Sequence, residues 1–178
     1  MRTPNPNPPS RKEWIDSDEG IKGVVVKELR RNEDERGWLI ELFRSDELPI
    51  LLGFSPKPCM AYLSCTAPDV QRGPHEHMNQ TDVFVFISGT FIIELWDNRP
   101  ESPTYKQWMH LCFDKSMPGL VVVPPGVVHG YKNIDSEPGL VFNAPNALFK
   151  GYQRKEEVDE IRHELNPKSP FNVNLSNF

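Results

Sequence analysis

Two of the five histidines lie two residues apart, in the segment Gly73-Pro74-His75-Glu76-His77. The segment is expected to form a strand, and residues i and i+2 of a strand project from the same face. His75 and His77 are therefore expected to point together into the interior of the fold, with Glu76 directed away. Imidazole is both a transition-metal ligand and an acid–base group near neutral pH. This pair can therefore serve either kind of chemistry.

Two further residues complete a candidate site. Asp82 follows His77 by five positions, directly before an apolar run, and His129 ends the segment PPGVVH. Three imidazoles and one carboxylate suit a divalent Fe, Mn, Ni, Co, Cu or Zn ion, and the ligand types do not select among these metals. Taken singly, each also has a structural interpretation: a hydrogen-bonded histidine pair, a strand cap and a core histidine. Their order and spacing favour one shared cluster of His75, His77, Asp82 and His129.

Short apolar or alternating runs, each of strand length, are expected to position these residues. They recur from Gly20 onward between turn signals rich in Pro, Gly and Asn. Residues 81–87 and 90–97 flank Ser88-Gly89-Thr90, which predicts a hairpin of two paired strands. Regularly spaced short strands predict an all-β antiparallel sandwich or barrel.

The two ends of the chain have a different composition. Residues 1–19 are predicted to form a flexible arm, because prolines there alternate with Asn and Ser. Val158, Ile161 and Leu165 follow a helical spacing. They predict a short C-terminal helix at about 152–165, followed by an extended tail.

Composition restricts the class of protein. The 178 residues are 38% hydrophobic and 25% charged, which excludes disorder of the whole chain. With a net charge of -5 and no dense basic run, nucleic acid is not an expected partner. Cysteines 59, 65 and 112 form no CxxC pair, which favours the reducing cytoplasm. No apolar run approaches the roughly 20 residues that span a bilayer, so no membrane partner is expected.

The candidate ligands and the glycines and prolines around them resemble the two motifs of the cupin superfamily. The matching positions are Gly73, His75, His77, Asp82, Gly89, Pro124, Gly126, His129 and Asn133. Cupins usually have Glu at the place of Asp82. The resemblance implies a cupin barrel, a double-stranded β-helix or jelly roll, with residues 20–178 forming a single domain.

Within the cupins, the chain is similar to the dTDP-4-dehydrorhamnose 3,5-epimerase family. Matching segments occur in the family's order between about residues 20 and 135: IKGVVV, EDERGW, RGPH, WDNRPESPTY and PPGVVHGY. The resemblance implies an epimerase or isomerase that acts on a nucleotide-linked keto-sugar. It also implies a homodimer.

Roles for individual residues follow from this resemblance. His75 stands at the place of the family's general base, which removes the proton α to the keto group, and His129 matches a second active-site histidine. Arg72 is expected to bind the diphosphate through its guanidinium. Arg36 and Glu41 are expected to contact the nucleotide, from the neighbouring subunit of a dimer.

The chain also departs from the family pattern. The family has an aromatic residue and Gln after its base, whereas Glu76 and His77 restore a metal-type motif here. Phe142 stands near the place of the family's general-acid Tyr and has no proton to donate. Tyr62 and Tyr131 are alternative acids, but the sequence places neither hydroxyl. The family's Asp partner for its base is unmatched.

Three functions are compatible with these residues. The first is a nucleotide-sugar epimerase in which a divalent ion polarises the keto oxygen. The second is a metal-dependent cupin oxygenase, in which the same four ligands bind Fe and leave positions open for oxygen. The third is a non-catalytic sugar-binding cupin, consistent with the missing Tyr. The epimerase-type segments favour the first.

Overall fold

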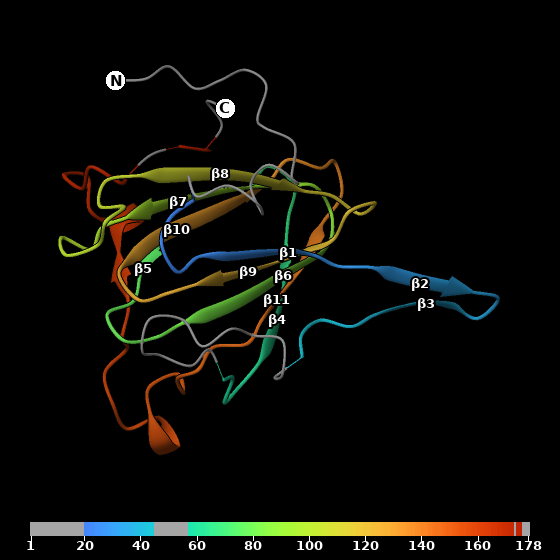
Figure 1. The fold of residues 1–178 in the computed structure, drawn as a ribbon, viewed down its shortest axis with the longest axis horizontal. Helices are drawn as coiled ribbons and strands as arrows, with labels where there is room; N and C mark the ends of the chain where they lie inside the picture. Colours follow the sequence, from blue (N-terminus) through green and yellow to red (C-terminus); the bar gives the residue numbers. More distant parts are fainter. Residues whose placement is uncertain (1–19, 45–56, 173, 176–178) are drawn as a thin grey trace.

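The computed structural model describes residues 20–44, 57–172 and 174–175. Two five-stranded antiparallel sheets form the layers of the fold (Figure 1). The first has the order β1-β9-β6-β11-β4, with strands Val25–Glu28, Gly119–Val123, Asp82–Ser88, Gly139–Asn143 and Tyr62–Thr66. The second has the order β12-β5-β10-β7-β8, with strands Ile161–Arg162, Gln71–Glu76, Val127–Asn133, Phe91–Asp97 and Trp108–Phe113. This arrangement confirms the predicted all-β jelly roll.

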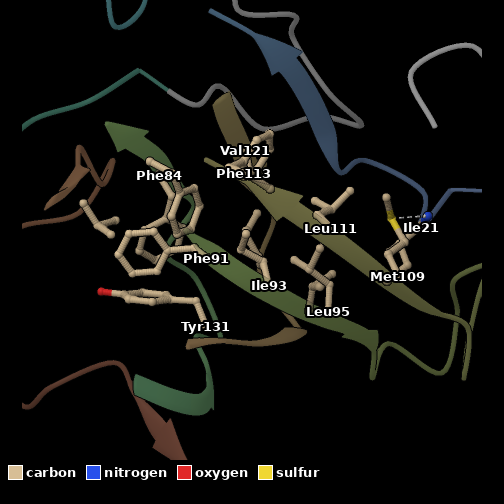
Figure 2. Packing of buried hydrophobic residues seen from close by; sticks show 14 residues of the cluster. Ile21, Phe84, Phe91, Ile93, Leu95, Met109, Leu111, Phe113, Val121 and Tyr131 are labelled. Carbon is tan, nitrogen blue, oxygen red and sulfur yellow. Dashed lines mark hydrogen bonds between the residues drawn. The ribbon is translucent and has the colours of Figure 1, made fainter. Parts of the chain in front are cut away.

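Large apolar side chains fill the space between the two sheets (Figure 2). Phe84 and Phe86 of β6 face this core, because alternate residues of a strand share a face. Val83 and Val85 of the same strand face the other side of the sheet and belong to a second apolar cluster. Both faces of β6 are therefore buried, which explains its uninterrupted apolar sequence.

The hairpin predicted for residues 81–97 does not form. β6 pairs with β9 and β11 in the first sheet, whereas β7 pairs with β10 and β8 in the second. The turn at Gly89, where φ is 89°, instead carries the chain from one sheet to the other. Burial on both faces gives β6 and β7 interior positions in separate sheets, so their partners are distant in sequence.

A small hairpin of β2 (Arg31–Asp34) and β3 (Gly37–Ile40) extends away from the two sheets (Figure 1). The Arg31 guanidinium lies 4.6 Å from the ring centre of Trp38. Trp38 and its neighbour Leu39 are nevertheless 54% and 64% exposed. The hairpin thus presents an apolar surface that the described residues do not cover.

The C-terminal helix predicted at about 152–165 is wrong. The segment contains two single turns of 3-10 helix, η1 (Tyr152–Arg154) and η2 (His163–Leu165), with the short strand β12 between them. The three apolar residues that suggested a helix are exposed. Main-chain pairing of β12 with β5 holds this part of the chain extended, so tertiary contacts override the helical periodicity.

The proline-rich arm predicted for residues 1–19 lies outside the described residues. The boundaries of a single domain at 20–178 stay a prediction. In the described part of the chain, no helix has the length and apolarity to cross a membrane. All three cysteines are free thiols.

Candidate active site

A cavity of about 970 Å³ holds most of the residues singled out in the sequence. Strands β4, β5 and β6 and the segment 147–164 line it. The lining includes His75, His77 and Asp82 together with Arg72. Four of the predicted site residues therefore line one cavity.

The three predicted histidines lie close together, with His75 and His77 on the cavity wall and His129 buried behind them, outside the cavity lining. His129 of β10 lies directly opposite His75 of β5 in the strand register, and their ring centres are 4.4 Å apart. The ring centre of His77 lies 5.8 Å from that of His75 and 6.0 Å from that of His129. The ligand atoms of the three rings all lie within 4.8 Å of one another. Glu76 points away, as predicted, and accepts a hydrogen bond from Asn98 at 2.9 Å.

Asp82 joins two of these histidines. Its Oδ2 lies 3.3 Å from Nε2 of His77 and 3.7 Å from Nε2 of His129. Its Oδ1 accepts hydrogen bonds from Gln80 Nε2 at 3.0 Å and from Asn143 Nδ2 at 2.8 Å. The structure therefore brings all four predicted ligands together, and two amide side chains fix the orientation of the carboxylate.

Backbone carbonyls determine the tautomers of His77 and His129. Nδ1 of His129 lies 3.0 Å from the carbonyl oxygen of Val127, and Nδ1 of His77 contacts the carbonyl oxygen of Asp159. A carbonyl oxygen only accepts, so Nδ1 carries the hydrogen in both rings and Nε2 carries a lone pair. Asp82 lies beside both Nε2 atoms, and Nε2 of His77 also accepts a hydrogen bond from Gln80 Nε2 at 3.1 Å.

This arrangement fits a divalent metal ion. Metal-binding histidines commonly donate their second ring N–H to a carbonyl in this way. Among the described residues, the buried Nε2 of His129 has no hydrogen-bond partner. Burial lowers the pKa of His129, although Asp82 opposes the shift. The lower pKa favours the neutral form of the ring, which is the form that binds a metal. His77, Asp82 and His129 would hold the ion, and His75, whose ligand atom lies within 4.8 Å of those of the other two histidines, is a fourth ligand unless it serves as a base.

His75 differs from its neighbours in its electrostatics. Burial, followed by the nearby His129 and His77, holds the pKa of His75 well below its usual range. The ring is therefore neutral at physiological pH and still lines the cavity. A neutral imidazole facing a cavity can accept a proton from a bound molecule.

The three predicted substrate contacts occupy different surroundings. Arg72 lines the cavity, where its Nε donates to Thr66 Oγ1 at 3.1 Å. Arg36 lies in the turn of the β2–β3 hairpin, its side chain 82% exposed and paired with Asp34. Glu41 follows the same hairpin, 3.8 Å from Arg44. The fold places Arg72 at the cavity but does not bring Arg36 or Glu41 into the cavity of the same chain.

Phe142 does not face the cavity. Val141 packs into the core between the sheets, whereas Phe142 packs against the second cluster on the outer face of the first sheet. The register between β11 and β6 shifts at this point because Ile87 of β6 has no partner, whereas β11 pairs with β4 without interruption. The next residue, Asn143, is buried and donates to Asp82 and to the hydroxyl of Tyr62. Asn143, not Phe142, therefore occupies the inward position of β11.

Sequence reasoning missed Asp159, which fastens the C-terminal segment onto the histidine motif. Its carboxylate accepts hydrogen bonds from the backbone N–H groups of Met78, Asn79 and Gln80, at 2.9, 2.8 and 3.0 Å. No local signal reveals this contact, because about 80 residues separate the partners in sequence. Asn143 could have been found from the sequence, because it is a single amide residue within an apolar strand.

The WDNRPESPTY segment, which supported the resemblance, has a structural role here. Asp97 accepts hydrogen bonds from Arg99 Nε at 2.7 Å, Ser102 Oγ at 2.5 Å and Thr104 Oγ1 at 2.6 Å. Burial raises the pKa of this carboxyl, but these donors outweigh it and lower the pKa to about 2. None of these residues lines the cavity. The segment therefore stabilises a loop outside the site.

Comparison with known proteins identifies the family of this chain. Residues 18–163 match the profile of the family described as dTDP-4-dehydrorhamnose 3,5-epimerase. The chain is 35% identical over 145 residues to the "Probable low-salt glycan biosynthesis epimerase Agl13" of Haloferax volcanii, covering 80% of this chain and 86% of that protein. It is 34% identical over 118 residues to the "Spore coat polysaccharide biosynthesis protein SpsL" of Bacillus subtilis, covering 66% and 75%.

A solved structure shares the fold. NovW, described as a 4-keto-6-deoxy sugar epimerase from the novobiocin biosynthetic gene cluster of Streptomyces spheroides, superposes with a TM-score of 0.69 at 24% identity. The match covers 83% of this chain and 73% of NovW. The family profile, the relative in Haloferax volcanii and the histidine-lined cavity together show that this chain belongs to the dTDP-4-dehydrorhamnose 3,5-epimerase family of sugar epimerases.

Proposed function

We propose that this protein epimerises a nucleotide-linked keto-sugar, with His75 as the general base. The observation that carries the proposal is the neutral, cavity-lining ring of His75 in a chain of the epimerase family. A keto group acidifies the adjacent C–H bond, and a neutral imidazole in hydrogen-bond reach can remove that proton. A cavity of about 970 Å³ is large enough for a ligand of this size.

Arg72 is the group that we assign to the diphosphate of the substrate. It lies on the same cavity wall as His75, three residues earlier in β5. A guanidinium binds phosphate oxygens through parallel N–H donors, which supports a diphosphate over a neutral linkage. The description of NovW as a 4-keto-6-deoxy sugar epimerase supports a keto group at C4.

The test is incubation of the purified protein with 4-keto nucleotide-sugars in deuterated water. We expect deuterium at C3 or C5, together with a new stereoisomer, detected by NMR and mass spectrometry. Absence of deuterium from every such substrate would exclude proton abstraction. Oxygen consumption with the same substrates would instead favour an oxygenase, and an unchanged bound sugar would favour a non-catalytic binding protein.

We also propose a divalent metal ion on His77, Asp82 and His129. The two Nε2 lone pairs and the Asp82 carboxylate beside them support it. When bound, the ion supplies positive charge that polarises a keto oxygen. Elemental analysis of the untreated protein is expected to find about one transition-metal ion per chain. In His77→Ala, the metal content is expected to fall roughly 10-fold or more.

His110→Ala is the control for this measurement, because His110 pairs with Glu94 on β7 and does not line the cavity. It is expected to retain the metal. A wild-type protein that carries no metal, and whose turnover survives His77→Ala, would refute the metal proposal and leave the role of His75 intact.

We propose a homodimer in which the β2–β3 hairpin lies against a second copy of the chain. The exposed Trp38 and Leu39 on this projecting hairpin support it. So does Arg36, a predicted nucleotide contact that does not line the cavity of its own chain. Light scattering is expected to give twice the mass of one chain for the wild type and the mass of one chain for Leu39→Asp. A monomeric wild type would contradict the proposal.

We place the protein in the cytoplasm. The three free, exposed cysteines support a reducing compartment, where thiols of this kind persist.

A further inference from the structure

Epimerisation requires a second acid–base group. The base removes a proton from one face of the carbon, and a donor must return a proton to the opposite face. Phe142 has no acidic hydrogen and faces the outer side of its sheet. The donor must therefore come from another strand of the cavity wall.

Tyr62 of β4 is one of two tyrosines on the cavity wall. It lines the cavity and pairs with Asn143 in the strand register. Its hydroxyl oxygen accepts a hydrogen bond from Asn143 Nδ2 at 2.8 Å. The same amide nitrogen donates to Asp82 at 2.8 Å, so Tyr62 is connected to the histidine cluster through one buried side chain.

The hydrogen of the Tyr62 hydroxyl is available to a ligand. The oxygen acts as acceptor toward Asn143, and in the described part of the chain no group accepts its hydrogen. Tyr62 is partly exposed, but burial around its hydroxyl raises its pKa to about 12, with Asn143 opposing the shift and Asp82 adding to it. The phenol therefore remains protonated across the physiological range and keeps the proton that an acid must deliver.

Tyr131, the other tyrosine on the cavity wall, is less suited to this role. Its ring is buried in the core among Phe84, Phe86 and Phe91 (Figure 2). Its hydroxyl lies 3.3 Å from Ser64 Oγ, a partner that can take or give the hydrogen bond. Ser64 Oγ donates to the carbonyl oxygen of Val141 at 3.2 Å, so it is free to accept the hydrogen of Tyr131, whereas the hydrogen of Tyr62 has no acceptor in the described part of the chain.

We propose that Tyr62 is the catalytic acid, supplied by β4 instead of β11. The inference rests on the proposed function. His75 takes the proton α to the keto group, and the electron pair of that C–H bond forms an enolate. The enolate carbon then takes the proton of the Tyr62 hydroxyl on its other face, which forms the new C–H bond and restores the C=O bond. The resulting imidazolium and phenolate return to their resting states by proton exchange with water.

Tyr62→Phe separates the two half-reactions. In deuterated water, we expect the variant to incorporate deuterium α to the keto group, because His75 can return a deuteron to the face from which it removed the proton. Formation of the epimer is expected to fall about 100-fold or more, since the acid is missing. Tyr62 is 47% exposed, so loss of one hydroxyl should shift the unfolding midpoint by only about 3 °C or less.

Two matched variants complete the experiment. Tyr105→Phe removes a phenol outside the cavity and should leave both rates unchanged. Tyr131→Phe should retain most of its epimer formation. Wild-type epimer formation by Tyr62→Phe, or exchange without epimer formation in Tyr131→Phe, would overturn the assignment. Failure of the proposed function looks different, because the wild type itself would then incorporate no deuterium.

Discussion

His75→Gln is expected to lose both deuterium exchange and epimer formation, by about 1,000-fold. Gln has a similar size and can form hydrogen bonds, but it has no basic nitrogen and cannot remove a proton from carbon. This result differs from that of Tyr62→Phe, which loses only the second half-reaction. Exchange of the α proton, followed by NMR in deuterated water, measures the effect directly.

The matched control is His110→Gln. His110 lies on β8, pairs with Glu94 and does not line the cavity, so this variant should keep the wild-type exchange rate. Exchange at the wild-type rate in a folded His75→Gln protein would show that another group is the base. His129, whose ring centre lies 4.4 Å from that of His75, would be the next candidate.

Gly73→Ala is expected to damage both the fold and the site. Gly73 has φ of 77°, a conformation that L-residues rarely adopt. A Cβ at this position would lie 2.7 Å from the carbonyl oxygen of His129 and 2.9 Å from Nδ1 of His75. The substitution must therefore move the two strands that bring these histidines together. We expect the free energy of unfolding to fall by about 3 kcal/mol and most of the turnover to be lost.

Gly37→Ala provides the control for this prediction. Gly37 also has a positive φ, 124°, but a Cβ added at this hairpin turn would have no atom of the described residues within 4 Å, its chain neighbours aside. Gly37→Ala introduces similar backbone strain but no steric clash. The free energy of unfolding should therefore fall by only about 1–2 kcal/mol, and turnover should be retained. Denaturant unfolding and turnover measure both variants. Equal losses in the two variants would contradict a steric cause.

The local part of the site was predictable from the sequence. The two-residue period of a strand places His75 and His77 on one face and Glu76 on the other, whatever the tertiary partners are. The resemblance of the segment around His129 to a cupin motif then predicted that His129 lies beside this pair, although it is distant in sequence. Burial of large apolar residues on alternating positions likewise predicted the strands themselves.

Contacts between distant segments were not predictable in this way. β6 and β7 look like a hairpin because they are adjacent, yet their doubly buried faces draw them into different sheets. Which face of β11 meets the site depends on the sheet around it: Val141 and Asn143 face inward and Phe142 faces outward, because alternate residues of a regular strand share a face. Apolar spacing in 152–165 suggested a helix, but pairing with β5 decides its conformation.

The contact between Asp159 and the loop after His77 has a consequence for biosynthesis. Nδ1 of His77 meets a carbonyl 82 positions later in the chain. During translation the histidine motif therefore leaves the ribosome well before the segment that orients His77. At about 5–20 residues per second, that delay lasts several seconds. The barrel strands can pair in this interval, but the site reaches its final geometry only after Asp159 has been synthesised.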